Sequence, residues 1–275
     1  MSRDVADAIE FVRGGADRRV LHDVAARRVQ LERLKDLLVE REDELTTALA
    51  TDLGKSAFES YTTEIGFTIN EIDHALKHLR RWVKPSSVAL PVHLRPGSAR
   101  VHPEPLGAVL IIAPWNYPVQ LVFAPLVAAL AAGNTAVLKP SEISSATAAA
   151  IARIVPEYFD PEVVQVVTGG VAETTVLLDA RWDHIFYTGN GTVGKIVMRA
   201  AADHLTPVTL ELGGKSPAIV TRRANLGVAA RRIAWGKWTN AGQTCVAPDY
   251  VLVDRTHTSQ FLAELSKAIG EFYGS

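Results

Sequence analysis

The chain has a single cysteine, Cys245, among its 275 residues. One cysteine cannot form a disulfide within the chain, which excludes the disulfide-rich small folds of secreted proteins. Residues 1–7 also lack the apolar core of a signal peptide. Together these absences predict a cytoplasmic protein.

An excess of charge of either sign is absent too, because 29 basic residues face 30 acidic residues and the formal net charge is -1. A nearly neutral chain has no summed field that would attract DNA, RNA or an anionic membrane. The sequence therefore predicts a small-molecule partner and no nucleic-acid partner.

Uninterrupted apolar runs of membrane-spanning length are missing as well. The most apolar region, residues 108–132, contains Asn116, Pro118, Gln120 and Pro125. A transmembrane helix needs about 20 predominantly apolar residues in a row, so no membrane segment is expected. Hydrophobic residues nevertheless make up 48% of the chain, which suffices for a large buried core.

A helical periodicity dominates the first part of the sequence. In residues 18–82, apolar side chains recur every three to four positions between charges, and residues 58–82 set them on one stripe. We expect helices here that pack on a core formed by later residues and do not make a domain of their own.

Beyond Pro105, short β-branched runs alternate with Ala-rich stretches. The expected strands are residues 108–112, 136–138, 163–167, 184–187 and 208–212. The expected helices between them are residues 118–132, 144–159, 172–178 and 192–202. This order is typical of an α/β fold with a doubly wound parallel sheet, whose ligands bind at the carboxyl ends of the strands.

A second α/β domain is expected to follow, with strands at residues 216–220 and 250–253 and a helix at residues 228–237. We therefore predict two domains. Residues 1–211 would hold the N-terminal helices and a dinucleotide-binding sheet, and residues 212–275 would hold the beginning of the second domain.

The segment Gly189-Asn190-Gly191-Thr192-Val193-Gly194 matches the G-x-G-x-x-G fingerprint of Rossmann-type dinucleotide-binding proteins. It follows an expected strand and opens an expected helix, where backbone N–H groups can approach a pyrophosphate. An ordinary glycine-rich turn is the alternative. A carboxylate that holds the ribose hydroxyls usually follows such a motif, and either Glu211 or Glu142, the latter together with Lys139, is suited to that role.

Two further side chains are candidates for chemistry. Asn116 lies between an expected strand and the helix that Pro118 is expected to begin, so its side chain can either donate to an oxyanion or cap the helix. Cys245 lies among small and polar residues, which suits a nucleophilic thiolate, although a buried small hydrophobe is the alternative. His74 and His78 are spaced for one helix face without a third ligand nearby, so no metal site is expected.

Taken in order, five segments resemble motifs of the aldehyde dehydrogenase superfamily, and within it the class 3 type that oxidises fatty and aromatic aldehydes. They are residues 114–118, 131–142, 186–194, 204–215 and 242–245. The resemblance implies oxidation of an aldehyde to a carboxylic acid with NAD or NADP. It also implies an aldehyde dehydrogenase-like fold, in which a catalytic domain follows the dinucleotide-binding domain.

The resemblance further implies a role for individual residues. Cys245 would attack the aldehyde, the Asn116 side chain and the Cys245 N–H would hold the resulting oxyanion, and Glu211 would act as general base. Glu142 should repel a 2′-phosphate and favour NAD, although the choice between the cofactors stays open. The implied cofactor-binding residues are Ile112, Pro114, Trp115, Lys139, Ser141, Glu142, Gly189, Asn190, Gly191, Val193, Gly194 and Leu212.

Members of this superfamily are longer and carry a Glu-x-Phe-Gly-Pro motif beyond the cysteine, which does not occur after Cys245 here. We therefore expect a C-terminally truncated chain that is weakly active or inactive, with a homodimer for the full-length parent. The alternatives are a non-catalytic fragment that binds a dinucleotide or associates with a complete homologue, and an acyl-CoA-forming relative with the same nucleophile.

Overall fold

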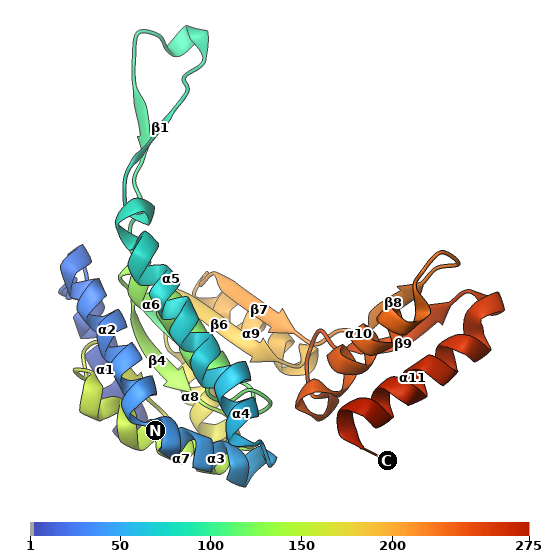
Figure 1. The fold of residues 1–275 in the computed structure, drawn as a ribbon. Helices are drawn as coiled ribbons and strands as arrows, with labels where there is room; N and C mark the ends of the chain where they lie inside the picture. The colour runs from blue at the N-terminus through green and yellow to red at the C-terminus, as the bar shows by residue number, and fades with distance from the viewer. Residues whose placement is uncertain (1–2, 275) are drawn as a thin grey trace. The chain divides into compact units, whose positions relative to one another are not determined.

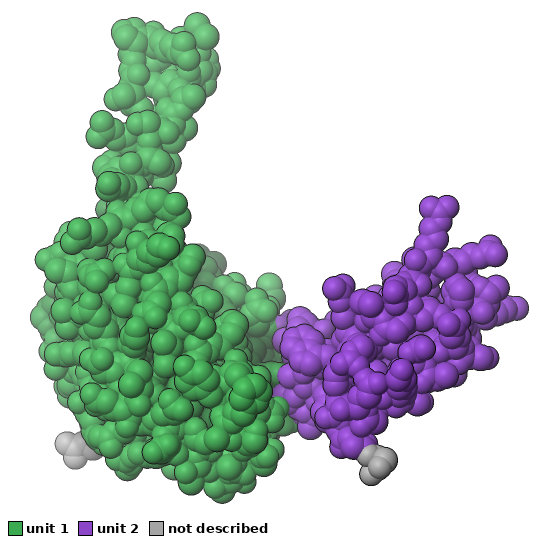
Figure 2. Space-filling view, in the orientation of Figure 1, with its two compact units in different colours: residues 1–211 green, residues 212–275 purple. Residues whose placement is uncertain are grey.

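The computed structural model describes residues 3–274, which divide into two compact units, residues 1–211 and residues 212–275 (Figure 2). Each unit has a sheet and a hydrophobic core of its own. The chain is therefore an α/β protein, as the alternation of strands and helices predicts.

The first unit is built on a five-stranded sheet in the order β5-β4-β3-β6-β7. The β3–β4, β3–β6 and β4–β5 pairs are parallel. The strand order reverses between β3 and β6, which is where doubly wound sheets open a ligand crevice. The strands are β3 (Ala108–Ile112), β4 (Thr135–Lys139), β5 (Val164–Val166), β6 (His184–Gly189) and β7 (Val208–Leu212).

Two hydrophobic cores lie on opposite faces of this sheet. Val109 and Ile111 of β3 belong to one core, while Leu110 and Ile112 belong to the other, as the alternation of side chains along a strand requires. The first core includes residues of α2 (Val24–Glu40), α3 (Glu42–Leu53), α5 (Gly66–Trp82), α6 (Gln120–Ala132) and α7 (Ser145–Tyr158). The second includes residues of α1 (Arg3–Asp17), α8 (Val171–Asp179) and α9 (Gly191–Asp203).

The N-terminal helices thus pack on the sheet and belong to the same compact unit as the sheet. Helices are expected from the sequence only from about residue 18, so α1 was not predicted. The stretch expected to be helical over residues 58–82 consists of the end of α4 (Ala57–Ser60) and of α5, joined by a π-helical turn, Tyr61–Ile65. The helix expected from Pro118 is assigned from Gln120, although the Leu121 N–H already donates to the Tyr117 carbonyl.

An antiparallel hairpin that the sequence reading did not predict leaves the body of the first unit after α5 (Figure 1). It pairs β1 (Ser86–Val88) with β2 (Ala99–Val101), and a 3-10 turn, Val92–Leu94, lies between the two strands. Among its exposed apolar residues are Val92 and Leu94. Among residues 3–274, no helix is both long and apolar enough to cross a membrane.

The second unit is a β-α-β arrangement with a further helix. β8 (Ser216–Val220) and β9 (Pro248–Val253) pair in parallel, and α10 (Leu226–Trp238) and a 3-10 turn, Thr239–Gly242, connect them. Helix α11 (Thr258–Tyr273) was not predicted from the sequence. Phe261 of α11 completes a small core with Val220, Leu226 and Ala230.

Candidate functional site

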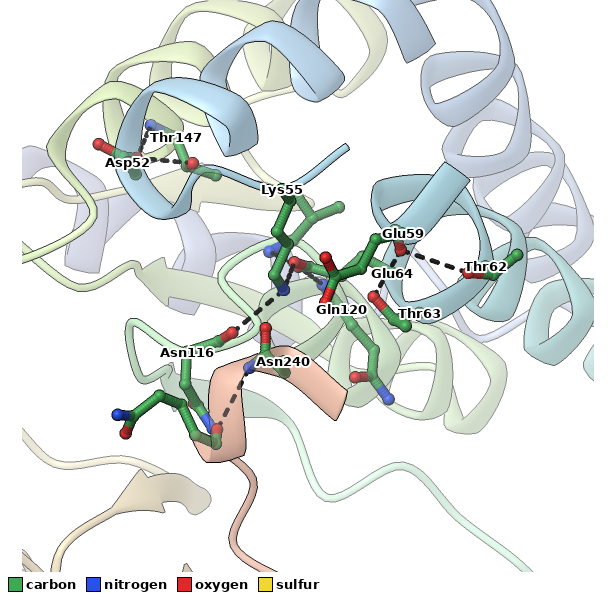
Figure 3. A network of polar contacts seen from close by, with 12 residues as sticks. Asp52, Lys55, Glu59, Thr62, Thr63, Glu64, Asn116, Gln120, Thr147 and Asn240 are labelled. Atoms are coloured by element: carbon green, nitrogen blue, oxygen red, sulfur yellow. Dashed lines mark hydrogen bonds and ion pairs between the residues drawn. The ribbon is translucent and has the colours of Figure 1, made fainter. Parts of the chain in front are cut away.

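The loop after β3 carries Asn116, and a buried ion pair contacts its main chain. The Lys55 ammonium lies 2.5 Å from a Glu64 carboxylate oxygen, and these side chains are 2% and 0% exposed. The same ammonium donates to the Asn116 backbone carbonyl at 3.2 Å and lies 4.3 Å from the centre of the Tyr117 ring (Figure 3). The main chain at Asn116 is thus fixed by a charged group that is out of contact with solvent.

Glu64 also caps the helix that follows this loop. Its Oε2 accepts hydrogen bonds from the backbone N–H groups of Val119 at 2.8 Å and of Gln120 at 3.2 Å. A carboxylate at a helix N-terminus satisfies unpaired amides and interacts favourably with the helix dipole. Glu64 therefore caps the start of this helix.

Burial raises the pKa of Glu64, against the opposing effects of the Lys55 charge and of the hydrogen bonds from Lys55, Val119 and Gln120. These partners thus offset part of the cost of burying the carboxylate. A change at any one of them would disturb the whole cluster.

The loop after β4 carries a second ion pair, with one partner reaching solvent. Lys139 is 3% exposed, and its ammonium donates to the Pro140 carbonyl and to Glu142 Oε2, both at 3.0 Å. Partial burial disfavours the Glu142 carboxylate, but hydrogen bonds from its own backbone N–H and from Lys139 hold its pKa below the usual range. Ser141 in the same loop is buried, and its hydroxyl accepts from the Ile143 N–H at 3.3 Å.

The loop after β6 carries the glycine motif. Asn190 caps α9, because its Oδ1 accepts from the Val193 N–H at 2.9 Å and its carbonyl accepts from the Gly194 N–H at 3.0 Å. A Cβ on Gly189 would lie 2.2 Å from the Tyr187 hydroxyl oxygen, whereas a Cβ on Gly191 would meet no atom within 4 Å. Gly189 is thus required by packing, while the backbone of Gly191 borders open space.

These three loops lie at one edge of the sheet, because β3, β4 and β6 run parallel and all three loops follow carboxyl ends. The structure thus brings together Pro114, Trp115 and Asn116 with Lys139, Ser141 and Glu142 and with the glycine motif. The G-x-G-x-x-G fingerprint usually follows the first strand of a doubly wound sheet. Here it follows the fourth, and the first carries Asn116 instead.

Glu211 and Leu212 lie in β7, the strand next to β6, and the side chain of Glu211 is exposed. Ile112 is the last residue of β3. The two alternatives for Glu211, ribose binding or base catalysis, both require the exposed carboxylate that the structure shows.

Cys245 lies in the second unit, in a turn closed by a hydrogen bond from the Ala247 N–H to the Thr244 carbonyl. It is exposed, so the alternative of a buried small hydrophobe is wrong. The preceding residues Asn240, Ala241 and Gly242 all have positive φ, at 55°, 51° and 77°. The Asn240 side chain donates to the Gln243 carbonyl at 3.2 Å within this segment (Figure 3). Left-handed conformations of non-glycine residues are costly and are concentrated at functional sites.

The sequence did not predict a role for Asp52, Lys55 or Glu64. One signal was present: Glu64 precedes Thr68 and Ile72 at four-residue spacing, so a carboxylate falls on a buried helical stripe.

His74 and His78 stack on each other with ring centres 4.3 Å apart on α5. Within residues 3–274, no group of three potential metal ligands is close enough together to hold an ion.

The sequence matches the model of the aldehyde dehydrogenase family over residues 2–272. This match covers nearly the whole chain, and the chain therefore belongs to the aldehyde dehydrogenase family. The resemblance in the ordered motifs is thereby confirmed.

Individual relatives agree with the class 3 resemblance. The chain is 49% identical to the Macaca fascicularis protein named aldehyde dehydrogenase family 3 member A2, over 89% of this chain and 50% of that protein. It is 46% identical to a Rattus norvegicus aldehyde dehydrogenase named dimeric and NADP-preferring, over 98% of this chain and 60% of that protein. A structure described as the substrate-bound state of Staphylococcus aureus AldH superposes with a TM-score of 0.96 at 45% identity, covering 98% of this chain and 59% of that one. The chain thus spans between half and three fifths of the length of these proteins.

Proposed function

We propose that this chain carries the nucleophile, the base, the oxyanion donor and the cofactor-binding edge of an NAD(P)-dependent aldehyde dehydrogenase. The observation that carries the proposal is the family match over residues 2–272. The position of Asn116 and the glycine motif at the same sheet edge supports it, because that edge borders the reversal of strand order.

Cys245 is the proposed nucleophile. Its thiolate adds to the aldehyde carbon, and the negative charge that moves to the carbonyl oxygen is stabilised by the Asn116 side chain and the Cys245 backbone N–H. Loss of hydride from the same carbon leaves a thioester on Cys245. Glu211 then removes a proton from water, which attacks the thioester, so that the carboxylic acid and the free thiol are released.

The residues at the sheet edge fit a dinucleotide. The half-exposed Glu142 carboxylate can accept from ribose hydroxyls while the buried Lys139 ammonium holds it in place. The capped start of α9, with open space at Gly191, suits a pyrophosphate. Bound NAD or NADP supplies the hydride acceptor.

The remaining members of the proposed cofactor site are Ile112, Pro114, Trp115, Ser141, Gly189, Asn190, Val193, Gly194 and Leu212. An aldehyde is the proposed substrate, and the name of the rat relative supports a dimer of the whole protein.

The decisive variant is Cys245→Ser, assayed for aldehyde-dependent NAD(P)H formation in the whole product of the reading frame. We expect kcat to fall by about 10³-fold or more, because the hydroxyl is a far weaker nucleophile, while the Kd for NAD(P) stays within about threefold. Unchanged turnover in Cys245→Ser would exclude the proposed mechanism.

The same assay on residues 1–275 alone distinguishes an active enzyme from a non-catalytic fragment that binds a dinucleotide. NAD(P) binding without turnover by this chain would favour a dinucleotide-binding fragment, and sequencing the coding DNA beyond Ser275 would show whether the frame continues. Comparing coenzyme A with water as the thioester acceptor separates hydrolysis from acyl-CoA formation.

A further inference from the structure

The turn at the end of α3 reaches two of the three loops at the proposed cofactor edge. α3 ends at Leu53, and Gly54 follows with φ 67°, a left-handed conformation that glycine adopts without strain. Asp52 and Lys55 lie on either side of this turn. Each one holds a different loop.

Asp52 caps α7, the helix that follows the Lys139–Glu142 loop. Its Oδ1 accepts from the Ala146 N–H at 3.0 Å, and its Oδ2 accepts from the Thr147 N–H at 2.7 Å and from the Thr147 hydroxyl at 2.8 Å (Figure 3). Ser144, the residue at the N-cap position, makes no such side-chain bond. The start of α7 is therefore fixed from another element of the chain.

Lys55 holds the other loop through its contacts with Glu64, the Asn116 carbonyl and the Tyr117 ring. Glu64 lies in the π-helical turn Tyr61–Ile65, and such turns are frequent at functional sites. A buried ion pair contributes little to stability compared with an apolar pair of the same size. What this pair does provide is a fixed position for the Asn116 backbone.

We propose that Lys55 and Asp52 are positioning residues for the reaction, Lys55 for the oxyanion donor Asn116 and Asp52 for the cofactor loop at Ser141 and Glu142. This inference rests on the proposed function. Neither residue touches the reacting atoms. Lys55 acts by fixing the main chain from which the Asn116 amide extends, and Asp52 acts by fixing the first turn of α7.

Substitutions of the two residues are expected to change different constants, kcat for Lys55 and the Kd for NAD(P) for Asp52, although the residues are close in sequence. Lys55→Met should lower kcat by about 10- to 100-fold, the cost of misplacing a catalytic group by roughly 1 Å, and leave the Kd for NAD(P) within about threefold. Asp52→Ala should raise that Kd by about tenfold and leave kcat within about threefold. Both are measured in the whole product of the reading frame.

Asp23→Ala is the matched control, because Asp23 caps α2 through the Ala25 N–H at 3.0 Å and belongs to no candidate loop. It should change neither constant by more than about twofold. If Asp52→Ala and Lys55→Met reduce kcat and affinity together, and in parallel with Asp23→Ala, the two residues are merely structural and the proposal is wrong.

The double variant Lys55→Met/Glu64→Gln distinguishes an effect on the position of Asn116 from an effect on the stability of the protein. It removes both buried charges, so the midpoint of urea denaturation should return most of the way to wild type. The kcat should stay low, because the Lys55 ammonium no longer holds the Asn116 carbonyl. Recovery of kcat together with the midpoint would overturn the proposal.

Amide hydrogen exchange of residues 116–121 gives a readout that needs no activity. Lys55→Met should accelerate exchange there by at least about tenfold, and Asp23→Ala should not. If wild type shows no aldehyde oxidation, the proposed function fails while this measurement still decides whether Lys55 fixes the loop. Unchanged exchange in Lys55→Met contradicts the positioning role even when the enzyme is active.

Discussion

The helices that follow β3 and β6 begin at the same edge of the sheet but are capped in opposite ways. α6 receives its cap from Glu64, more than fifty residues earlier in the chain, and the capping carboxylate is fully buried. α9 is capped by Asn190, the residue just before it. A distant cap fixes a loop from inside the protein, whereas a local cap leaves the helix start facing outward, where a ligand can reach the backbone.

The largest expected effect concerns the two caps themselves. Glu64→Ala leaves the Lys55 charge buried without its partner and should lower the free energy of unfolding by about 3–5 kcal/mol. Asn190→Ala removes an ordinary cap and should cost about 1 kcal/mol. Urea denaturation of both variants measures the difference. Equal losses of unfolding free energy in the two variants would mean that the buried cap contributes no more to stability than the local cap.

A second test concerns the two glycines at the start of α9. Gly189→Ala places a methyl group against the buried Tyr187 ring and should cost about 1–3 kcal/mol, as overpacking does. Gly191→Ala meets open space, so its stability should stay within about 0.5 kcal/mol of wild type. The Kd for NAD(P) should nevertheless rise in Gly191→Ala if the pyrophosphate lies there. Thermal unfolding and equilibrium binding of the same samples give both values, and a stable Gly191→Ala with unchanged affinity would place the cofactor elsewhere.

The smallest expected effect is a pH dependence at the beginning of β6, the strand that leads to α9. Burial lowers the pKa of His184, whose Nε2 lies 3.0 Å from the Thr209 hydroxyl. The unfolded chain therefore binds the proton first as pH falls through the ordinary histidine range, and stability decreases on acidification. We expect the free energy of unfolding of wild type to fall more between pH 7.5 and 5.5 than that of His184→Gln. An identical pH dependence in both proteins would show that His184 does not carry it.

The contrast between local and distant caps also explains which features could be predicted from the sequence. β3, β4 and the glycine motif are specified locally, by β-branched runs and by residues next to the turns that they form, so their positions follow from short windows of sequence. The starts of α6 and α7 are capped by Glu64 and Asp52. These residues lie 55 and 95 positions before the amides that they accept from, so no local pattern joins them to the helices. Asn116 was found from its place after a strand, but the group that holds it was not.

The hairpin β1–β2 and helices α1 and α11 were missed for different reasons. The hairpin strands have three residues each, which is too short for alternation to be recognised. α1 mixes apolar residues with Gly14 and Gly15, and glycine weakens any helix assignment. α11 was not predicted, because the last element expected from the sequence is the strand at residues 250–253.

The placement of successive β3 residues in two different cores has a consequence for how the gene can change. Replacing one aliphatic residue by another in residues 108–112 alters packing on one face only. A one-residue insertion or deletion there moves every following side chain to the opposite face, so both cores fail at once. In a library of single-codon insertions and deletions, β3 should therefore be among the least tolerant segments, while the exposed tip of the hairpin around Val92 should accept them readily.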